Sequence, residues 1–378
     1  MTLGLSGNTL TGSLPTELGL LTACQALLLV DTQIPGTIPT EIASMTALTI
    51  FAARLNFFSG SIPSFFGALP NLSTLDLSEC SFQGSVPNIF SSPSMQTLLL
   101  AGNALTGTLP ISSTSSTSLT YLDLQQCQFS GPIPDFSSLT QLTTLYLNGN
   151  QFTGTVPTTL WTLASLQALS LSSNLLTGTM PGADIAFLQK LTSLDLSNNA
   201  FIKGQIASDL AAVPSLQFLN FSATQRTGTI PSEFFFLNGL EVLSLASNQL
   251  TGGVPVPTGP VWQSLIHLDL SNNNIGGTLP SQIATFSRLG ESGFPVINSC
   301  FCHFSHMLLA LIHFRNSGFE QCGTFGNNSF RNRDDWKLDS TGLEFEHVYR
   351  HIVHRDWSNI NTTDTKPCKL VRGWTDSY

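Results

Sequence analysis

Several residues in the last part of the chain have side chains that could bind a metal ion. Cys300, Cys302, His303 and His306 lie close together, and thiolate and imidazole are the groups that zinc prefers. A structural zinc site needs four ligands, which usually come as two pairs at standard spacing. No second pair completes such a site, so we predict no metal site. These cysteines are interpreted as unpaired or as the remnant of a disulfide.

A second motif in this part has residues suited to phosphoryl transfer. His354-Arg355-Asp356, with Asn361 five residues after the aspartate, resembles the catalytic loop of protein kinases. The resemblance implies a catalytic base at Asp356 and a magnesium ligand at Asn361. However, Ser358 stands where that loop usually has lysine, and no Asp-Phe-Gly motif follows. The motif is therefore a chance match or a kinase relic, and we predict neither catalysis nor a cofactor.

The remaining chemistry-bearing residues recur at regular intervals. Asp76, Asp123 and Asp269 occupy the same place in different copies of a repeat, and no histidine or cysteine is placed to form a triad with them. This pattern predicts a binding protein rather than an enzyme.

Charge divides the chain into two parts. Residues 1–289 contain five basic and thirteen acidic residues, whereas residues 290–378 contain nine basic and ten acidic ones. We therefore predict a repeat domain over 1–289 and an irregular, poorly ordered tail over 290–378. The net charge of −9 argues against a nucleic-acid partner, because no basic stripe is available to displace counterions from phosphate.

The first part is built from about twelve repeats. A Gly-x-(Ile/Val/Leu/Met)-Pro segment recurs in steps of 23 to 26 residues, with proline missing only after Gly204, where Ala207 stands instead. The repeat glycines are Gly12, Gly36, Gly60, Gly84, Gly107, Gly131, Gly154, Gly178, Gly204, Gly228, Gly252 and Gly277. A period of this length indicates a solenoid, in which each repeat forms one coil.

Upstream of each glycine the pattern L-x-x-L-x-L-x-x-N predicts a short strand with its leucines buried. Four residues before the glycine stands a small polar residue whose side chain can bond to nearby backbone, so stacked coils should form an internal polar ladder. The predicted ladder residues are Asn8, Thr32, Asn56, Cys80, Asn103, Cys127, Asn150, Asn174, Asn199, Thr224, Asn248 and Asn273. Cys80 and Cys127 should lie too far apart to pair, and Cys24, at a leucine position, should lie in the core.

The full pattern, exemplified by residues 145–157 (LYLNGNQFTGTVP), resembles the plant-type leucine-rich repeat of receptor-like kinases and receptor-like proteins. The resemblance covers residues 1 to about 289. It implies an α/β repeat solenoid, a right-handed superhelix with a concave parallel β-sheet, additional short strands and short 3-10 or helical turns. It also implies a peptide or protein ligand and a possible co-receptor.

Residues between the strand leucines should point outward onto the concave face, where an extended partner can bind. The predicted ligand-binding residues are Asp76, Tyr121, Asp123, Tyr146, Asn148 and Phe218. Tyr121 and Tyr146 fall in neighbouring coils, and an exposed aromatic pair with a polar rim is typical of an interaction hot spot. The alternative is that these tyrosines only cover the sheet and that the aspartates are repeat consensus.

The ends of the chain bear on its cellular location. Met1 falls inside the first repeat without a secretion signal, which suggests a fragment or an incorrect gene model, or else a cytosolic protein. The longest apolar run after residue 289, Met307 to Ile312, is too short to span a membrane. Family resemblance favours an extracellular or cell-surface location. Glycosylation sequons then matter, and they occur at Asn71, Asn220, Asn327 and Asn361.

Three functions remain open at this stage. The first is the ligand-binding part of a receptor-like protein in signalling or defence. The second is a soluble inhibitor or scaffold, and the third is a truncated receptor kinase that retains a relic of the kinase loop.

Overall fold

The computed structural model describes residues 1–289 apart from 112–117, 181, 200, 256–261, 282, 284, 285 and 287. The cysteine and histidine cluster at 300–306, the kinase-like motif at 354–361, and the sequons at Asn327 and Asn361 lie outside the described residues.

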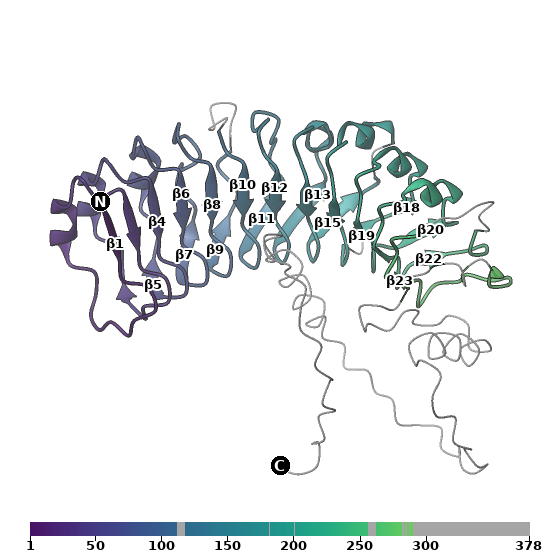
Figure 1. Ribbon diagram of the computed structural model, residues 1–378, viewed down its shortest axis with the longest axis horizontal. Helices are drawn as coiled ribbons and strands as arrows, with labels where there is room; N and C mark the ends of the chain where they lie inside the picture. The colour runs from purple at the N-terminus through teal and green to yellow at the C-terminus, as the bar shows by residue number, and fades with distance from the viewer. Residues whose placement is uncertain are drawn as a thin grey trace, which may run out of the picture. The chain divides into compact units, whose positions relative to one another are not determined.

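One strand from each repeat joins a parallel twelve-stranded sheet (Figure 1). The strands are β1 (Thr2–Gly4), β2 (Ala26–Leu28), β4 (Ile50–Ala52), β6 (Thr74–Asp76), β8 (Thr97–Leu99), β10 (Tyr121–Asp123), β12 (Thr144–Tyr146), β14 (Ala168–Ser170), β16 (Ser193–Asp195), β19 (Phe218–Asn220), β21 (Val242–Ser244) and β23 (His267–Asp269). The register aligns equivalent residues, so Leu122 pairs with Leu98 on one side and Leu145 on the other. This arrangement confirms the predicted leucine-rich-repeat fold.

A second set of strands surrounds the repeat glycines. An eight-stranded parallel sheet contains β3 (Pro35–Gly36), β5 (Phe57–Gly60), β7 (Ser81–Ser85), β9 (Ala104–Gly107), β11 (Gln128–Pro132), β13 (Gln151–Thr155), β15 (Leu175–Gly178) and β17 (Phe201–Ile202). A three-stranded sheet follows, made of β18 (Gly204–Gln205), β20 (Arg226–Gly228) and β22 (Gln249–Leu250). The two sheets separate between β17 and β18, in the irregular repeat that lacks the proline.

Short 3-10 helices follow several of the Gly-x-x-Pro segments, including the one in which Ala207 replaces the proline. They are η1 (Thr16–Leu20), η2 (Thr40–Ser44), η3 (Ser64–Ala68), η4 (Thr158–Thr162), η5 (Ala183–Phe187), η6 (Ser208–Ala212) and η7 (Ser232–Phe236). Pro39, for example, has extended backbone and precedes η2, where its fixed φ and missing N–H suit a helix start. Each helix is one or two turns long, as expected for 3-10 geometry.

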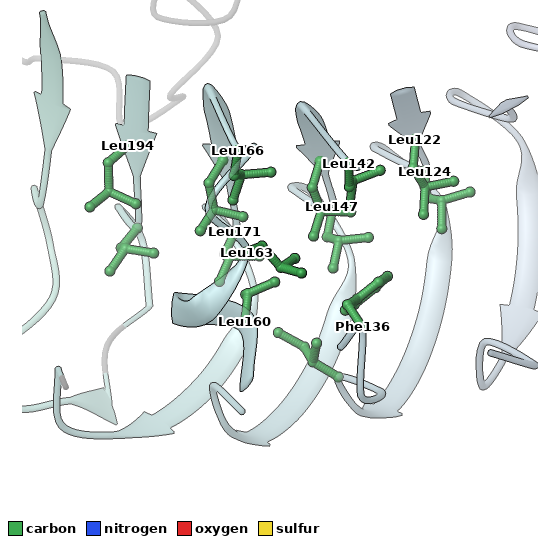
Figure 2. Close-up of a cluster of buried hydrophobic side chains, with 14 of the residues drawn as sticks. Leu122, Leu124, Phe136, Leu142, Leu147, Leu160, Leu163, Leu166, Leu171 and Leu194 are labelled. Carbon is green, nitrogen blue, oxygen red and sulfur yellow. The ribbon is translucent and has the colours of Figure 1, made fainter. Parts of the chain in front are cut away.

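Leucines of successive coils stack into one continuous core (Figure 2). Leu142 and Leu147 of one coil and Leu166 and Leu171 of the next are all fully buried. Burying a leucine side chain stabilises a fold by about 1.5–3 kcal/mol, so the repeated leucines are the main source of stability. Each coil can bury its leucines only against neighbouring coils, which makes the coils mutually dependent.

The asparagines of the predicted ladder, apart from Asn8, lie between the coils and bond to backbone of the preceding coil and of their own. Asn150 is representative: its Nδ2 donates to the carbonyl oxygens of Leu124 in the preceding coil (2.8 Å) and Leu147 in its own coil (3.0 Å). Its Oδ1 accepts from the Phe129 N–H of the preceding coil at 3.0 Å. Equivalent bonds to a preceding-coil carbonyl are made by Asn56, Asn103, Asn174, Asn199, Asn248 and Asn273. Thr32 and Thr224 instead donate to a carbonyl oxygen of their own coil and to the ladder asparagine of the next coil.

The ladder cysteines keep the bond to the preceding coil, whereas the first asparagine, Asn8, does not. The thiols of Cys80 and Cys127 donate to the preceding-coil carbonyls of Ala53 (3.4 Å) and Leu100 (3.5 Å), as the asparagine amides do. Asn8 is exposed and donates to Leu5 and Ser6 of its own coil. Cys24 is fully buried in the core, at its leucine position.

Candidate functional site

The register of the twelve-stranded sheet decides which predicted site residues become neighbours. Asp76, Leu99, Asp123 and Tyr146 are paired in sequence across β6, β8, β10 and β12. Each is the last residue of its strand. We call the line of these residues, continued by Ser170, Asp195, Asn220, Ser244 and Asp269, the central row. Because side chains alternate along a strand, the central row lies on the face of the sheet opposite the leucine core.

Tyr121 and Tyr146 form an aromatic pair on this face. Their ring centroids are 5.9 Å apart and their planes are at 90°, an edge-to-face contact that is favourable for aromatic rings. Burial, followed by the neighbouring Tyr146 and Asp123, raises the pKa of Tyr121, so its phenol stays protonated at neutral pH. Tyr121 therefore offers a hydroxyl donor on a rigid aromatic platform.

The prediction that both tyrosines are exposed is wrong for Tyr146. Tyr121 is half-buried, whereas Tyr146 is only 3% exposed. Asp76, Asp123 and Asn148 are also largely buried. Central-row side chains are flanked along the strand and across it, which removes most of their surface from water. Tyr121, at the start of its strand, has fewer flanking groups.

A chain of polar side chains adjoins the tyrosines. The two carboxylate oxygens of Asp123 accept from the backbone N–H (3.1 Å) and the Nε2 (3.0 Å) of Gln125. The Oε1 of Gln125 accepts from Nδ2 of Asn148 at 3.1 Å. Together Tyr121, Asp123, Gln125, Tyr146 and Asn148 form what we call the tyrosine site.

Asp123 supplies the carboxylate of this site, and its pKa is raised. Burial raises its pKa to about 6, opposed by the Gln125 hydrogen bonds, and the charges of Asp76 and Glu79 raise it further. The carboxylate is therefore mostly ionised at neutral pH but protonates in mildly acidic conditions. A cationic group of a ligand beside it would favour the ionised form.

The other predicted residues do not join the tyrosine site. Asp76 lies two strands from Asp123, and its Oδ1 accepts from the backbone N–H of Ser78 at 3.1 Å. Asp195 and Asp269 make the same bond to the residue two positions on, so this contact belongs to the repeat itself. Phe218, on β19, lies three strands beyond β12.

Sequence reasoning missed a buried guanidinium. Arg226 has no exposed surface, although it stands where other repeats have a core residue such as Phe152 or Leu176. Its Nη1 donates to the Gln205 carbonyl at 3.4 Å, and its guanidinium lies 5.1 Å from the Phe221 ring centre. Nε and Nη2 have no hydrogen-bond partner among the described residues. Burial lowers its pKa to about 10. An alignment of the repeats with one another would have revealed this residue.

No group of three or more metal-ligating side chains occurs in the part of the chain that the structure describes. Burial raises the pKa of the Cys80 and Cys127 thiols to about 11, so both stay protonated and unreactive at neutral pH. Within the same residues, no helix has the length and apolar character that a membrane crossing requires. Of the two described sequons, Asn71 is exposed, whereas Asn220 is 4% exposed and leaves little room for a glycan.

Leucine-rich-repeat family profiles match several parts of the chain, at residues 71–93, 118–139, 135–176, 187–211 and 264–286. Receptor-like protein 32 of Arabidopsis thaliana is 37% identical over 114 residues, which cover 29% of this chain and 13% of that protein. Cuscuta receptor 1 of Solanum lycopersicum is 41% identical over 92 residues, covering 24% of this chain and 8% of that protein. The matched segments are thus a small part of these relatives.

Solved structures match a larger share of this chain than these relatives do. The plant peptide hormone receptor RGFR1 in complex with RGF2 has a TM-score of 0.70 and 31% identity, over 76% of this chain and 46% of that one. The Arabidopsis receptor kinase HAESA, in complex with the peptide hormone IDA and the co-receptor SERK1, has a TM-score of 0.64 and 30% identity, over 76% and 52%. A plant ice-binding protein has a TM-score of 0.52 and 29% identity, over 72% and 80%.

The repeat pattern, the sheet topology and these matches agree with one another. The chain is a leucine-rich-repeat protein of the plant type, similar to the ectodomains of receptor-like proteins and receptor kinases.

Proposed function

We propose that the chain binds an extended peptide or protein segment along the solvent side of its twelve-stranded sheet, with the tyrosine site as the anchor. The observation that carries the proposal is that the Tyr121–Tyr146 pair and the Asp123–Gln125–Asn148 hydrogen-bond chain share two paired strands, with Asp123 opposite Tyr146. Rigid aromatic rings beside fixed polar groups are typical of hot spots, because they lose little side-chain entropy when a ligand binds.

The charge of this surface favours a ligand that carries basic residues. Asp76, Asp123, Asp195 and Asp269 all lie in the central row, and residues 1–289 contain more than twice as many acidic as basic residues. A lysine or arginine near Asp123 would gain from the carboxylate and from the adjacent aromatic faces. Basic residues of the ligand would also increase the association rate at low ionic strength.

The similar receptors support a role in signalling or defence. RGFR1 is described as a peptide hormone receptor, and HAESA as bound to both a peptide hormone and a co-receptor. By analogy, this chain would be the ligand-binding part of a non-catalytic receptor-like protein at the cell surface, and a co-receptor could join once the ligand is bound.

Selection from a random peptide library with the full chain tests this proposal. Peptides retained by the wild-type chain should be enriched in lysine and arginine. They should bind Tyr121→Ala about tenfold or more weakly, because removing a hot-spot aromatic typically costs about 2 kcal/mol. Tyr121→Phe keeps the ring and removes the hydroxyl, so it distinguishes the contribution of the aromatic ring to binding from that of the hydroxyl group. Retained peptides that bind Tyr121→Ala and Asp123→Asn as tightly as the wild type would contradict the proposal.

A further inference from the structure

The residues that flank the repeat glycines form a second regular surface. They belong to a different part of each repeat, and to a different sheet, from the central row. Serine or threonine occupies eight of the twelve positions before these glycines and nine of the twelve positions after them. Lys203 is the one charged residue among the flanking positions. The longest well-populated stretch, which we call the hydroxyl strip, contains Thr106, Thr108, Ser130, Thr153, Thr155, Thr177 and Thr179. All are exposed except Ser130, which is half-buried.

The strands of the eight-stranded sheet hold these residues in a two-dimensional array. The register is staggered, so the residue after one glycine pairs with the residue before the next: Ser85 with Thr106, and Thr155 with Thr177. Neighbouring parallel strands lie about 4.8 Å apart, and alternate residues of one strand about 6.7 Å apart. Hydroxyl-bearing side chains therefore recur both along the strands and from coil to coil.

The repeat glycines orient Thr108, Thr155 and Thr179, the three strip threonines that follow a repeat glycine. Each threonine after a glycine directs its Cγ2 methyl group at the next repeat glycine, which has no side chain of its own. A Cβ built on Gly178 would lie 2.9 Å from Cγ2 of Thr155, and one on Gly131 would lie 3.0 Å from Cγ2 of Thr108. Since threonine is stiff at χ1, a seated methyl group also fixes its hydroxyl. Thr108, Thr155 and Thr179 thus hold their methyl and hydroxyl groups in fixed positions on the strip.

The chemistry of the strip selects a neutral partner that is periodic in two dimensions. A charged ligand would find no counter-charge on it, and a polysaccharide would gain from aromatic rings, of which the strip has none. Ordered water has the required properties, because water forms cages over methyl groups and hydrogen bonds to hydroxyls. We propose that the hydroxyl strip binds the surface of ice. This activity uses a different sheet from peptide binding and does not depend on it.

Incorporation of the full chain into slowly growing ice tests the proposal directly. The wild-type chain should enter the ice and slow the coarsening of ice crystals in a frozen sucrose film. Thr155→Lys/Thr177→Lys places two charged, mobile side chains on a cross-strand pair of the strip, and should reduce both effects several-fold. Thermal unfolding and circular dichroism establish that this variant keeps its fold.

A matched control adds the same charge elsewhere. Ala164 and Ala212 are exposed and lie outside the strip, so Ala164→Lys/Ala212→Lys should enter ice as the wild type does. The proposal is overturned if ice excludes the wild-type chain, or if the strip variant and the control variant are incorporated equally. It is also overturned if the strip variant loses binding to a plant polysaccharide while the wild-type chain stays out of ice.

Discussion

The two main sheets present opposite kinds of surface, although one repeat builds both. On the twelve-stranded sheet the outward residues differ from coil to coil, and Asp123, Tyr146 and Ser170 are successive neighbours in the central row. On the eight-stranded sheet the outward residues around the glycines are mainly serine and threonine. A varied surface can recognise one sequence of side chains, whereas a uniform surface can match only a partner that repeats. The difference indicates which surface should be specific.

The largest expected effect is a loss of folding stability when a side chain of the twelve-stranded sheet is truncated. Tyr146 is 3% exposed and packs against Tyr121, so Tyr146→Ala should destabilise the fold by about 3–5 kcal/mol, as for other buried aromatic truncations. Equilibrium denaturation with urea measures this loss. A loss below about 1 kcal/mol would mean that Tyr146 only covers the surface.

A second prediction concerns pH. Because folding raises the pKa of Asp123 from 3.8 to about 6, the folded chain holds the proton more tightly than the unfolded chain does. The ionised carboxylate therefore lowers the free energy of unfolding as pH rises from about 4 to 6, by about 3 kcal/mol in total. Asp123→Asn should abolish this decline, as seen by comparing urea unfolding at the two ends of the window. An identical pH dependence in wild type and variant would show that Asp123 is not the group responsible.

Arg226 provides a test in which the substitution should stabilise the fold. It occupies a core position at the start of β20, the middle strand of the three-stranded sheet, whereas the equivalent Phe152 of the eight-stranded sheet is apolar. Two of its guanidinium nitrogens have no hydrogen-bond partner among the described residues. Replacing a buried, poorly compensated charge with an apolar side chain can stabilise a protein by about 1–4 kcal/mol. Arg226→Leu should therefore raise the melting temperature, and Phe152→Leu serves as the matched control. A lower melting temperature for Arg226→Leu would show that the guanidinium stabilises the fold.

The smallest expected effect lies on the hydroxyl strip. Thr155 is exposed, and its hydroxyl makes no hydrogen bond to the protein within the described residues, so Thr155→Ala should change stability by less than about 0.5 kcal/mol. The same urea titration used for Tyr146→Ala gives the comparison. A loss similar to that of Tyr146→Ala would mean that the methyl contact with Gly178 contributes to folding.

Most of the fold could be predicted from the sequence, because leucine spacing and the Gly-x-x-Pro segments recur in every coil. The strands around the glycines came from family resemblance rather than from periodicity. The break between β17 and β18 was signalled by the 26-residue step and by Ala207, but its effect on strand pairing depends on tertiary contacts.

Less of the candidate site could be predicted. Alternation places Tyr121 and Tyr146 on the same face, but it does not distinguish the first residue of a strand from the last, so the burial of Tyr146 was missed. The link from Asp123 through Gln125 to Asn148 depends on side-chain conformations in two coils. The ligand-binding roles of all six predicted residues stay predictions: Asp76, Tyr121, Asp123, Tyr146, Asn148 and Phe218.

The central claim is that a ligand binds the varied sheet and not the uniform one. The most direct measurement is the affinity of a library-selected peptide for three chains: wild type, Tyr121→Ala and Thr155→Lys/Thr177→Lys. The account predicts that Tyr121→Ala weakens binding about tenfold or more and that the strip variant binds as the wild type does. Unchanged affinity for Tyr121→Ala together with lost affinity for the strip variant would contradict it.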